Sequence, residues 1–191
     1  IDEALQEFEH ALRADPKFVT AHLNRIELMI VDLGEHEQAV RMCDELLAGN
    51  PELPRLDRGN EGEVYYLKAK AVFYLDDLEG ALFLTRRAMK TAGEVPIYRA
   101  FDGQILFELA RFDDARRSLE SAVSLDPESG HALYHLALAL LEDGDEVVLP
   151  SPCWVTFPEQ IRLTGATPVL VPTSAEDGFA IHADPILAAL N

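Results

Sequence analysis

Two histidines are the clearest candidates for metal chemistry in this sequence. His131 and His135 are four residues apart, so a helix would place both imidazoles on one face, where they can ligate a metal ion. No motif supplies a third ligand, and His131 falls at the expected start of its helix. We therefore interpret the pair as a polar surface lining and predict no metal site.

The two cysteines favour neither a disulfide framework nor a zinc site. Cys43 and Cys153 lie far apart in the sequence, and neither forms part of a Cys-x-x-Cys pair. Isolated thiols of this kind are typical of proteins in a reducing compartment. We therefore expect a cytoplasmic location.

Composition narrows the class of protein. The chain has 191 residues, with 34 Asp and Glu against 16 Lys and Arg, a formal net charge of -18 and 48% hydrophobic residues. It is too apolar for a disordered chain and too acidic for a nucleic-acid reader. No apolar run approaches the roughly 18 residues that a membrane span needs. The composition predicts one or two ordinary folded domains, with neither nucleic acid nor membrane as partner.

Both ends indicate a piece of a longer product. The sequence opens at Ile1 inside a helical pattern, and the apolar run of residues 186–190 begins a helix that stops at Asn191. We expect the natural chain to continue past these points. A signal peptide upstream stays an open alternative.

A recurring pattern covers the first three quarters of the chain. Its equivalent alanines, spaced 35, 42 and 34 residues apart, are Ala4, Ala39, Ala81 and Ala115. The spacing is close to the roughly 34 residues of a helix-turn-helix repeat, and Asp-Pro ends two of the second helices at Pro16 and Pro127. Over about residues 1–142 the chain resembles the tetratricopeptide repeat family, which implies a mainly α solenoid of about 3.5 to 4 repeats.

Small residues explain how the repeat packs. Alanine at the recurring positions, and Ala69, Gly103 and Ala137 on the partner helices, let two antiparallel helices approach closely. The expected helices span residues 1–14, 20–33, 37–48, 63–75, 78–91, 96–109, 112–124 and 130–142. The 42-residue interval is a repeat with an inserted loop over residues 51–60, and Gly34 and Gly144 fall at turns between helices.

The family resemblance implies a binding groove lined by the first helix of each pair. By register, the predicted groove residues are Asn24, Leu28, Val31, Tyr66, Lys70, Phe73, Tyr74, Ala100, Gln104, Phe107, His131, Tyr134, Leu138 and Leu141. Aromatic and apolar side chains dominate this row, which favours a peptide or a partner helix as the ligand. The alternative is that several of them are core between repeats. Some family members clamp C-terminal carboxylates, but only Asn24, Arg25 and Lys70 suit such a clamp here, so we do not expect that mode.

A different pattern begins at Gly144. Residues 146–150 are typical of a buried strand, residues 155–164 have helical spacing, and residues 165–172 contain a second apolar run. Strand, helix and strand predict a small βαβ unit over residues 143–191. Gly144-Asp145-Glu146-Val147, Pro152-Cys153-Trp154 and Phe157-Pro158-Glu159 resemble class I/II aminotransferases, the pyridoxal-phosphate enzymes of the aspartate aminotransferase type. The resemblance implies that Trp154 stacks on the cofactor ring wherever a complete site exists, with an indole covering a small core as the alternative.

Catalysis by this enzyme family needs residues that the segment does not contain. The resemblance implies a Schiff-base lysine, an acidic partner for the pyridinium nitrogen and a phosphate cradle. The last lysine in the chain is Lys90, within the repeats, so residues 143–191 supply no such amine. We predict no catalytic residue and no cofactor for the chain by itself.

Together these patterns predict a non-catalytic repeat scaffold that binds a protein or peptide in its groove, with a partial aminotransferase-like segment after it. The alternative is a fragment of a pyridoxal-phosphate aminotransferase fused to repeats that act in targeting or oligomerisation. A third possibility is a regulator whose groove senses a small ligand or peptide. Absorbance after addition of pyridoxal phosphate would separate the enzyme from the other two.

Overall fold

The computed structural model describes residues 2–190. The chain divides into two compact units, Ile1–His135 and Leu136–Asn191, and each is described here by itself. The first unit is helical, whereas the second contains a small sheet. The sequence predicted this order, with helical repeats first and a small α/β segment after them.

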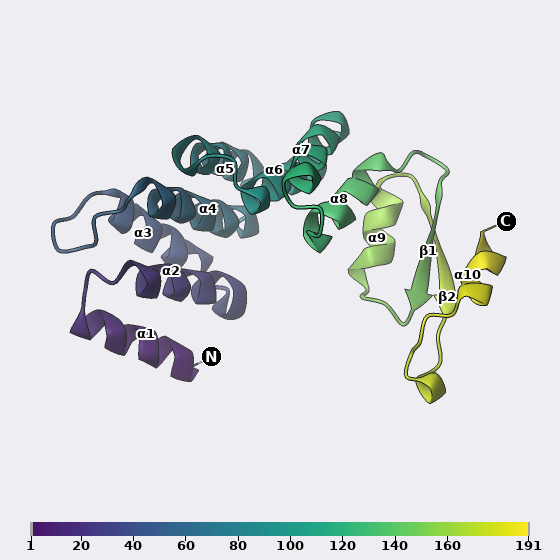
Figure 1. Cartoon of the computed structure of the whole chain (residues 1–191), viewed down its shortest axis with the longest axis horizontal. Helices are drawn as coiled ribbons and strands as arrows, with labels where there is room; N and C mark the ends of the chain where they lie inside the picture. Colours follow the sequence, from purple (N-terminus) through teal and green to yellow (C-terminus); the bar gives the residue numbers. More distant parts are fainter. Residues whose placement is uncertain (1, 191) are drawn as a thin grey trace. The chain divides into compact units, whose positions relative to one another are not determined.

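Helices follow one another through the first unit, and the connection between α3 and α4 is a longer loop than the others (Figure 1). They are α1 (Asp2–Ala14), α2 (Val19–Leu28), α3 (His36–Leu47), α4 (Arg58–Tyr74), α5 (Leu78–Ala92), α6 (Pro96–Glu108), α7 (Phe112–Leu125) and the start of α8 (Gly130–Leu140). A π-helical turn, Met29–Leu33, extends α2 and completes the predicted helix over residues 20–33. Consecutive helices α4 and α5, and α6 and α7, pack as pairs, which confirms the helix-turn-helix solenoid.

Small side chains sit where the paired helices meet. Ala39, Ala81 and Ala115 are fully buried, whereas Ala4 is exposed. In the α6–α7 pair, a Cβ atom added to Gly103 would lie only 2.4 Å from Cγ of Leu119. The close approach that the sequence predicted for Gly103 is therefore present, since even one methyl group does not fit there.

The turns between paired helices repeat one backbone conformation. Gly34, Asp76 and Ala110, each between the two helices of a pair, have φ angles of 67°, 65° and 55°, and they lie 42 and 34 residues apart. After α4, Asp77 N donates to Val72 O at 3.2 Å, and after α6 Arg111 N donates to Leu106 O at 2.9 Å. Such bonds satisfy carbonyl groups at a helix C-terminus. The fold thus keeps the same left-handed turn whether or not a glycine is present.

The inserted loop is shorter than the sequence predicted. The predicted loop reached Asn60, but α4 begins at Arg58. Asp57 is the N-cap, and its Oδ1 accepts a hydrogen bond from Asn60 N at 2.8 Å. The prediction was wrong for the last three loop residues because the Pro and Gly content of residues 51–60 indicated a loop, whereas the Asp57 cap initiates the helix.

The second unit contains the predicted βαβ arrangement. Strands β1 (Glu146–Ser151) and β2 (Thr167–Pro172) pair in parallel, with Val148 opposite Val169, and α9 (Thr156–Leu163) connects them. Ile161, Ala166 and Val171 are buried. A 3-10 turn (Ala175–Asp177) and α10 (Ala183–Ala189) follow. A small α/β unit is therefore confirmed after the helical repeats.

Within residues 2–190, none of the helices combines the length and the apolar character that a membrane-spanning segment needs.

Candidate functional site

A cavity of about 390 Å³ lies across the first helices of two neighbouring pairs, α4 and α6, with its far end at the turn into α8. We call it the aromatic groove. Its lining residues are Tyr66, Lys70, Phe73, Tyr74, Ile97, Ala100, Phe101, Gln104, Asp126, Ser129 and His131. The groove thus draws its residues from α4, α6 and α8 and from the connection between α7 and α8.

Tilted and edge-on rings form the floor of the aromatic groove. The ring of Tyr66 lies 4.8 Å from that of Tyr98 and 5.6 Å from that of Phe101, measured between centroids. Phe73 packs against Phe101 at 5.4 Å and against Tyr74 at 5.8 Å. Rings in such arrangements hold one another in place, so the floor is already ordered for an apolar side chain of a ligand.

The tyrosines of the floor stay protonated. Burial raises the pKa of Tyr66 above its ordinary value, and the carboxylates of Glu63 and Glu27 raise it further. Burial also raises the pKa of Tyr98, whose hydroxyl donates to Glu63 Oε2 at 2.6 Å. These phenols are therefore neutral hydrogen-bonding groups at any physiological pH.

Polar groups at the rim provide the hydrogen-bonding capacity. Lys70 Nζ donates to Glu27 Oε1 at 2.9 Å and lies 5.7 Å from the centre of the Tyr66 ring, so its charge is already matched. Gln104 offers an amide that both donates and accepts, and Ser129 offers a hydroxyl. This combination of ordered rings and neutral polar groups suits a peptide, with an apolar side chain on the floor and its backbone at the rim.

The two histidines of α8 are neutral neighbours. Their rings lie 4.6 Å apart, and burial lowers the pKa of His131. Burial first, and the nearby His131 second, lower the pKa of His135 to about 4, and its Nδ1 has no hydrogen-bond partner among the described residues. Within residues 2–190, no three metal-binding side chains gather around one point.

The structure brings half of the predicted groove residues to one place. Those that line the aromatic groove are Tyr66, Lys70, Phe73, Tyr74, Ala100, Gln104 and His131. The residues that do not line it are Asn24, Leu28, Val31, Phe107, Tyr134, Leu138 and Leu141. Among the latter, Phe107 and Leu138 are buried, and Asn24 and Val31 are exposed.

Sequence reasoning missed four lining residues. Ile97 and Phe101 belong with Ala100 and Gln104 to one α6 stripe at i, i+3, i+4 and i+7, a spacing that would have identified them. Asp126 and Ser129 come from the connection between α7 and α8. Their position depends on how the next repeat packs, which no local pattern gives.

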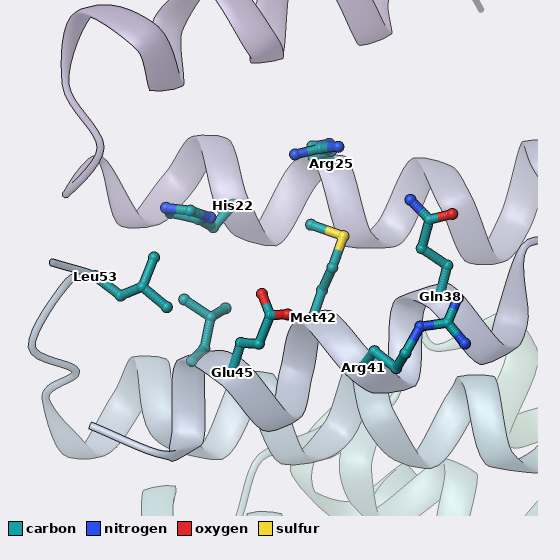
Figure 2. A pocket seen from close by; sticks show the side chains of 8 residues that line it. His22, Arg25, Gln38, Arg41, Met42, Glu45 and Leu53 are labelled. Atoms are coloured by element: carbon teal, nitrogen blue, oxygen red, sulfur yellow. The ribbon is translucent and has the colours of Figure 1, made fainter. Parts of the chain in front are cut away.

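Arg25, one of the three candidates for a carboxylate clamp, lines a different cavity. Figure 2 shows Gln38, Arg41, Met42 and Glu45 along α3, opposite His22 and Arg25 on α2, with Leu53 from the inserted loop at one end. The cavity has a volume of about 430 Å³. Arg25 pairs with Glu9 at 3.7 Å, whereas Lys70 lies in the aromatic groove. The three clamp candidates are therefore not assembled at one site.

The second unit does not fit pyridoxal phosphate. Trp154 is 71% exposed, and the residues from Leu136 onward include no lysine that could hold the cofactor through its amine. Arg162, the one basic residue after position 143 apart from His182, pairs with Glu159. The residues present therefore do not supply the amine that this cofactor needs.

Comparison with known proteins supports the tetratricopeptide repeat resemblance. Residues 103–147 match the family model described as Tetratricopeptide repeat. The fold is similar to the crystal structure of MamA, with a TM-score of 0.56 and 22% identity, over 72% of this chain and 75% of that one. It is also similar to YrrB, titled a TPR protein with an unusual peptide-binding site, with a TM-score of 0.51 and 20% identity, over 72% and 66% of the two chains. At this identity the structural likeness establishes the fold.

Aspartate aminotransferases match shorter stretches. The chain is 50% identical over 54 residues to a probable aspartate/prephenate aminotransferase of Aquifex aeolicus, covering 28% of this chain and 14% of that protein. It is 31% identical over 87 residues to an aspartate aminotransferase of Bacillus sp. strain YM-2, covering 46% and 22%. The chain therefore spans less than a quarter of the length of either relative. Both resemblances predicted from the sequence are confirmed, to tetratricopeptide repeats and, over a partial stretch, to aminotransferases.

Proposed function

We propose that the first unit is a protein-interaction scaffold that binds a peptide or a partner helix in the aromatic groove. The observation that carries this proposal is the convergence of Tyr66 and Phe73 from α4 with Gln104 from α6 in one cavity. These residues are 38 positions apart at most, yet they meet only through packing between repeats. A cytoplasmic location is part of the proposal.

The size and chemistry of the groove define how a ligand would sit. A volume of about 390 Å³ is at the lower end of binding cavities, so it accepts one or two side chains and leaves the rest of a peptide at the surface. The ring of Phe73 would contact the apolar anchor, and the Gln104 amide would bond the peptide backbone. Because Lys70 is already paired with Glu27, a free carboxylate is not required of the ligand.

Selection from a peptide library tests the proposal. Twelve-residue peptides displayed on phage would be selected on the immobilised 191-residue chain, and synthetic copies of the selected peptides measured by fluorescence anisotropy. We expect Phe73→Ala and Gln104→Ala to weaken binding at least tenfold, since truncation of a buried anchor has effects of this size. Phe18→Ala is the matched control, because Phe18 is 47% exposed and lines neither this groove nor another of the cavities described here.

Two outcomes would place the binding site elsewhere. If every selected peptide binds Phe73→Ala and Gln104→Ala as tightly as the parent chain, the aromatic groove is not the binding site. Loss of binding in Phe18→Ala alone would place the interaction outside the groove.

A second candidate follows from the aminotransferase matches. The chain would be a fragment of a pyridoxal-phosphate aminotransferase fused to repeats, as the 50% identity over 54 residues suggests. The missing amine would then have to come from residues outside this sequence. Reading the coding sequence past Asn191, followed by a transamination assay on the longer product, tests it: a stop codon soon after Asn191 would remove the enzyme candidate.

A further inference from the structure

A larger cavity, of about 700 Å³, lies along α5 and shares no residue with the aromatic groove. We call it the basic cavity, because five cations line it: Arg58, Arg86, Arg87, Lys90 and Arg111. They come from the start of α4, from one face of α5 and from the turn between α6 and α7. The cavity therefore exists only because three separate segments pack together.

This concentration of positive charge stands out against the rest of the chain. The whole chain has 16 Lys and Arg and a net charge of -18, yet five of those 16 cations line this one cavity. Only two carboxylates, Glu61 and Glu79, line it with them. The local balance is thus positive within an acidic molecule.

Three of the cations form no ion pair with the part of the chain that the structure describes. Arg58 Nε donates to the Thr91 carbonyl at 3.0 Å, and the Arg87 guanidinium lies 4.9 Å from the centre of the Tyr65 ring. Lys90 is exposed, and within residues 2–190 no ion pair includes Arg58, Arg87 or Lys90. Their contacts fix two of the side chains in position without matching their charge.

The other two cations are held by carboxylates of the neighbouring helices. Arg86 Nε donates to Asp102 Oδ1 at 2.9 Å, and Arg111 Nη2 donates to Asp114 Oδ2 at 2.7 Å. Asp102 is buried and also accepts from Ser118 Oγ at 2.8 Å. These bonds anchor the wall of the cavity, while the unmatched charges remain available to a ligand.

An apolar surface lies among the cations. Phe83 is 64% exposed on the same face of α5 as Arg86, Arg87 and Lys90, and the largely buried Leu82 adjoins it. Such a ring gains from contact with an apolar side chain of a ligand. A ligand that matches the whole surface therefore carries carboxylates on both sides of an apolar group.

We propose that the basic cavity is a second docking site, for an acidic peptide with an apolar residue between its carboxylates. Guanidinium groups bind carboxylates through paired hydrogen bonds, and Phe83 contacts the apolar residue. Screening by salt limits the range of electrostatic attraction to about 8–10 Å at physiological ionic strength. A short peptide stays within that range of the charges in the cavity. A nucleic acid would extend past the cavity onto the acidic remainder of the chain and be repelled, and a free phosphate would make no use of Phe83.

Fluorescence anisotropy tests the proposal with a defined probe. The probe is a fluorescein-labelled pentapeptide with a central leucine and two glutamates on each side, and its glutamine counterpart is the uncharged control. We expect the glutamate peptide to bind the 191-residue chain, more weakly in 200 mM than in 50 mM NaCl, and the glutamine peptide not to bind. Arg87→Glu combined with Lys90→Glu should weaken binding at least tenfold, and Phe83→Ala about threefold to tenfold.

Matched variants distinguish binding at the basic cavity from non-specific attraction between charges and from binding in the aromatic groove. Arg13→Glu combined with Lys17→Glu makes the same change in net charge at exposed positions outside the cavity, and it should leave binding unchanged. Phe73→Ala, in the aromatic groove, should also leave it unchanged, so the two proposals fail independently. The proposal is overturned if the glutamate peptide does not bind, if the Arg13 and Lys17 variant weakens binding equally, or if 10 mM inorganic phosphate displaces the probe completely.

Discussion

Replacing Gly103 by alanine should destabilise the first unit, although alanine is the better helix former. Ala in place of Gly in a helix interior contributes about 1 kcal/mol in favour of folding. The new Cβ atom, however, would lie 2.4, 2.8 and 3.2 Å from Cγ, Cδ2 and Cδ1 of Leu119. Ordinary contacts between carbon atoms are about 3.5–4.0 Å, so the whole isopropyl group must move.

Leu119 has nowhere to move, because it is completely buried between α6 and α7. Overpacking of this kind costs about 1–3 kcal/mol. With all three atoms of the leucine end too close, we place the cost in the upper part of that range. After subtraction of the helix-propensity gain, Gly103→Ala should lower the free energy of unfolding by about 1–2 kcal/mol.

Urea titration followed by circular dichroism at 222 nm measures this change. Gly59→Ala is the control: Gly59 is in the first turn of α4, and its added Cβ would lie 3.4 Å from the nearest atom, Asp57 Oδ1. It should be neutral or slightly stabilising. Leu119→Ala alone should cost about 2–5 kcal/mol, and it should cost about 1–2 kcal/mol less in the Gly103→Ala background, where the methyl group occupies part of the space. A Gly103→Ala chain as stable as the parent, or strictly additive double-variant energies, would refute the packing argument.

Three further predictions concern single groups. Burial raises the pKa of the Cys43 thiol to about 12, so at pH 8 a thiol reagent should modify Cys153 and reach Cys43 only after unfolding; rapid modification of both native thiols would contradict this. The folded pKa of His135 is about 4, below its ordinary value of 6.5, so the unfolded chain binds the proton first and stability should fall as the pH drops from about 6.5 towards 4. When the pH is lowered from 7.5 to 5.0, the free energy of unfolding of the parent chain should fall by up to about 2 kcal/mol more than that of His135→Gln, measured by urea titration. Equal decreases in the two chains would exclude the effect. Ala110 has a left-handed backbone with φ 55°, so Ala110→Gly should raise the unfolding free energy by up to about 1 kcal/mol in the same titration. Arg116→Gly, inside α7, is its control and should lower that free energy, and a loss of stability in both variants would contradict the argument.

The sequence predicted the helical part of the fold well because the repeat signals are local. The recurring alanines, Asp-Pro and the turn positions each act within a few residues, and their recurrence fixed the period before any packing was known. The exception was the start of α4, where Asp57 caps a helix within a segment whose Pro and Gly content indicated a loop. In the second unit the alternation of apolar runs gave the parallel βαβ arrangement for the same local reason.

The groove was predicted only in part, since a register shows which face a residue occupies and not what lies opposite. Phe107 has the same register as the groove residues but is buried, with its ring 5.3 Å from that of Phe112. Tyr66 and Phe73 do line the groove, because Phe101 of the next pair packs against both rings. These contacts join residues that are 28 or more positions apart in the sequence. The periodicity of a single helix does not encode contacts of that range.

By itself, the sequence determined the repeat period, the helix pairs, the acidic character of the chain and the change to a βαβ unit after Gly144. Only the tertiary structure decided which side chains share a cavity. The basic cavity illustrates the difference, because Arg58, Arg87 and Arg111 belong to different segments and nothing local links them. Secondary structure follows from short-range preferences that the chain carries residue by residue, whereas a binding surface arises from the packing of helices against one another.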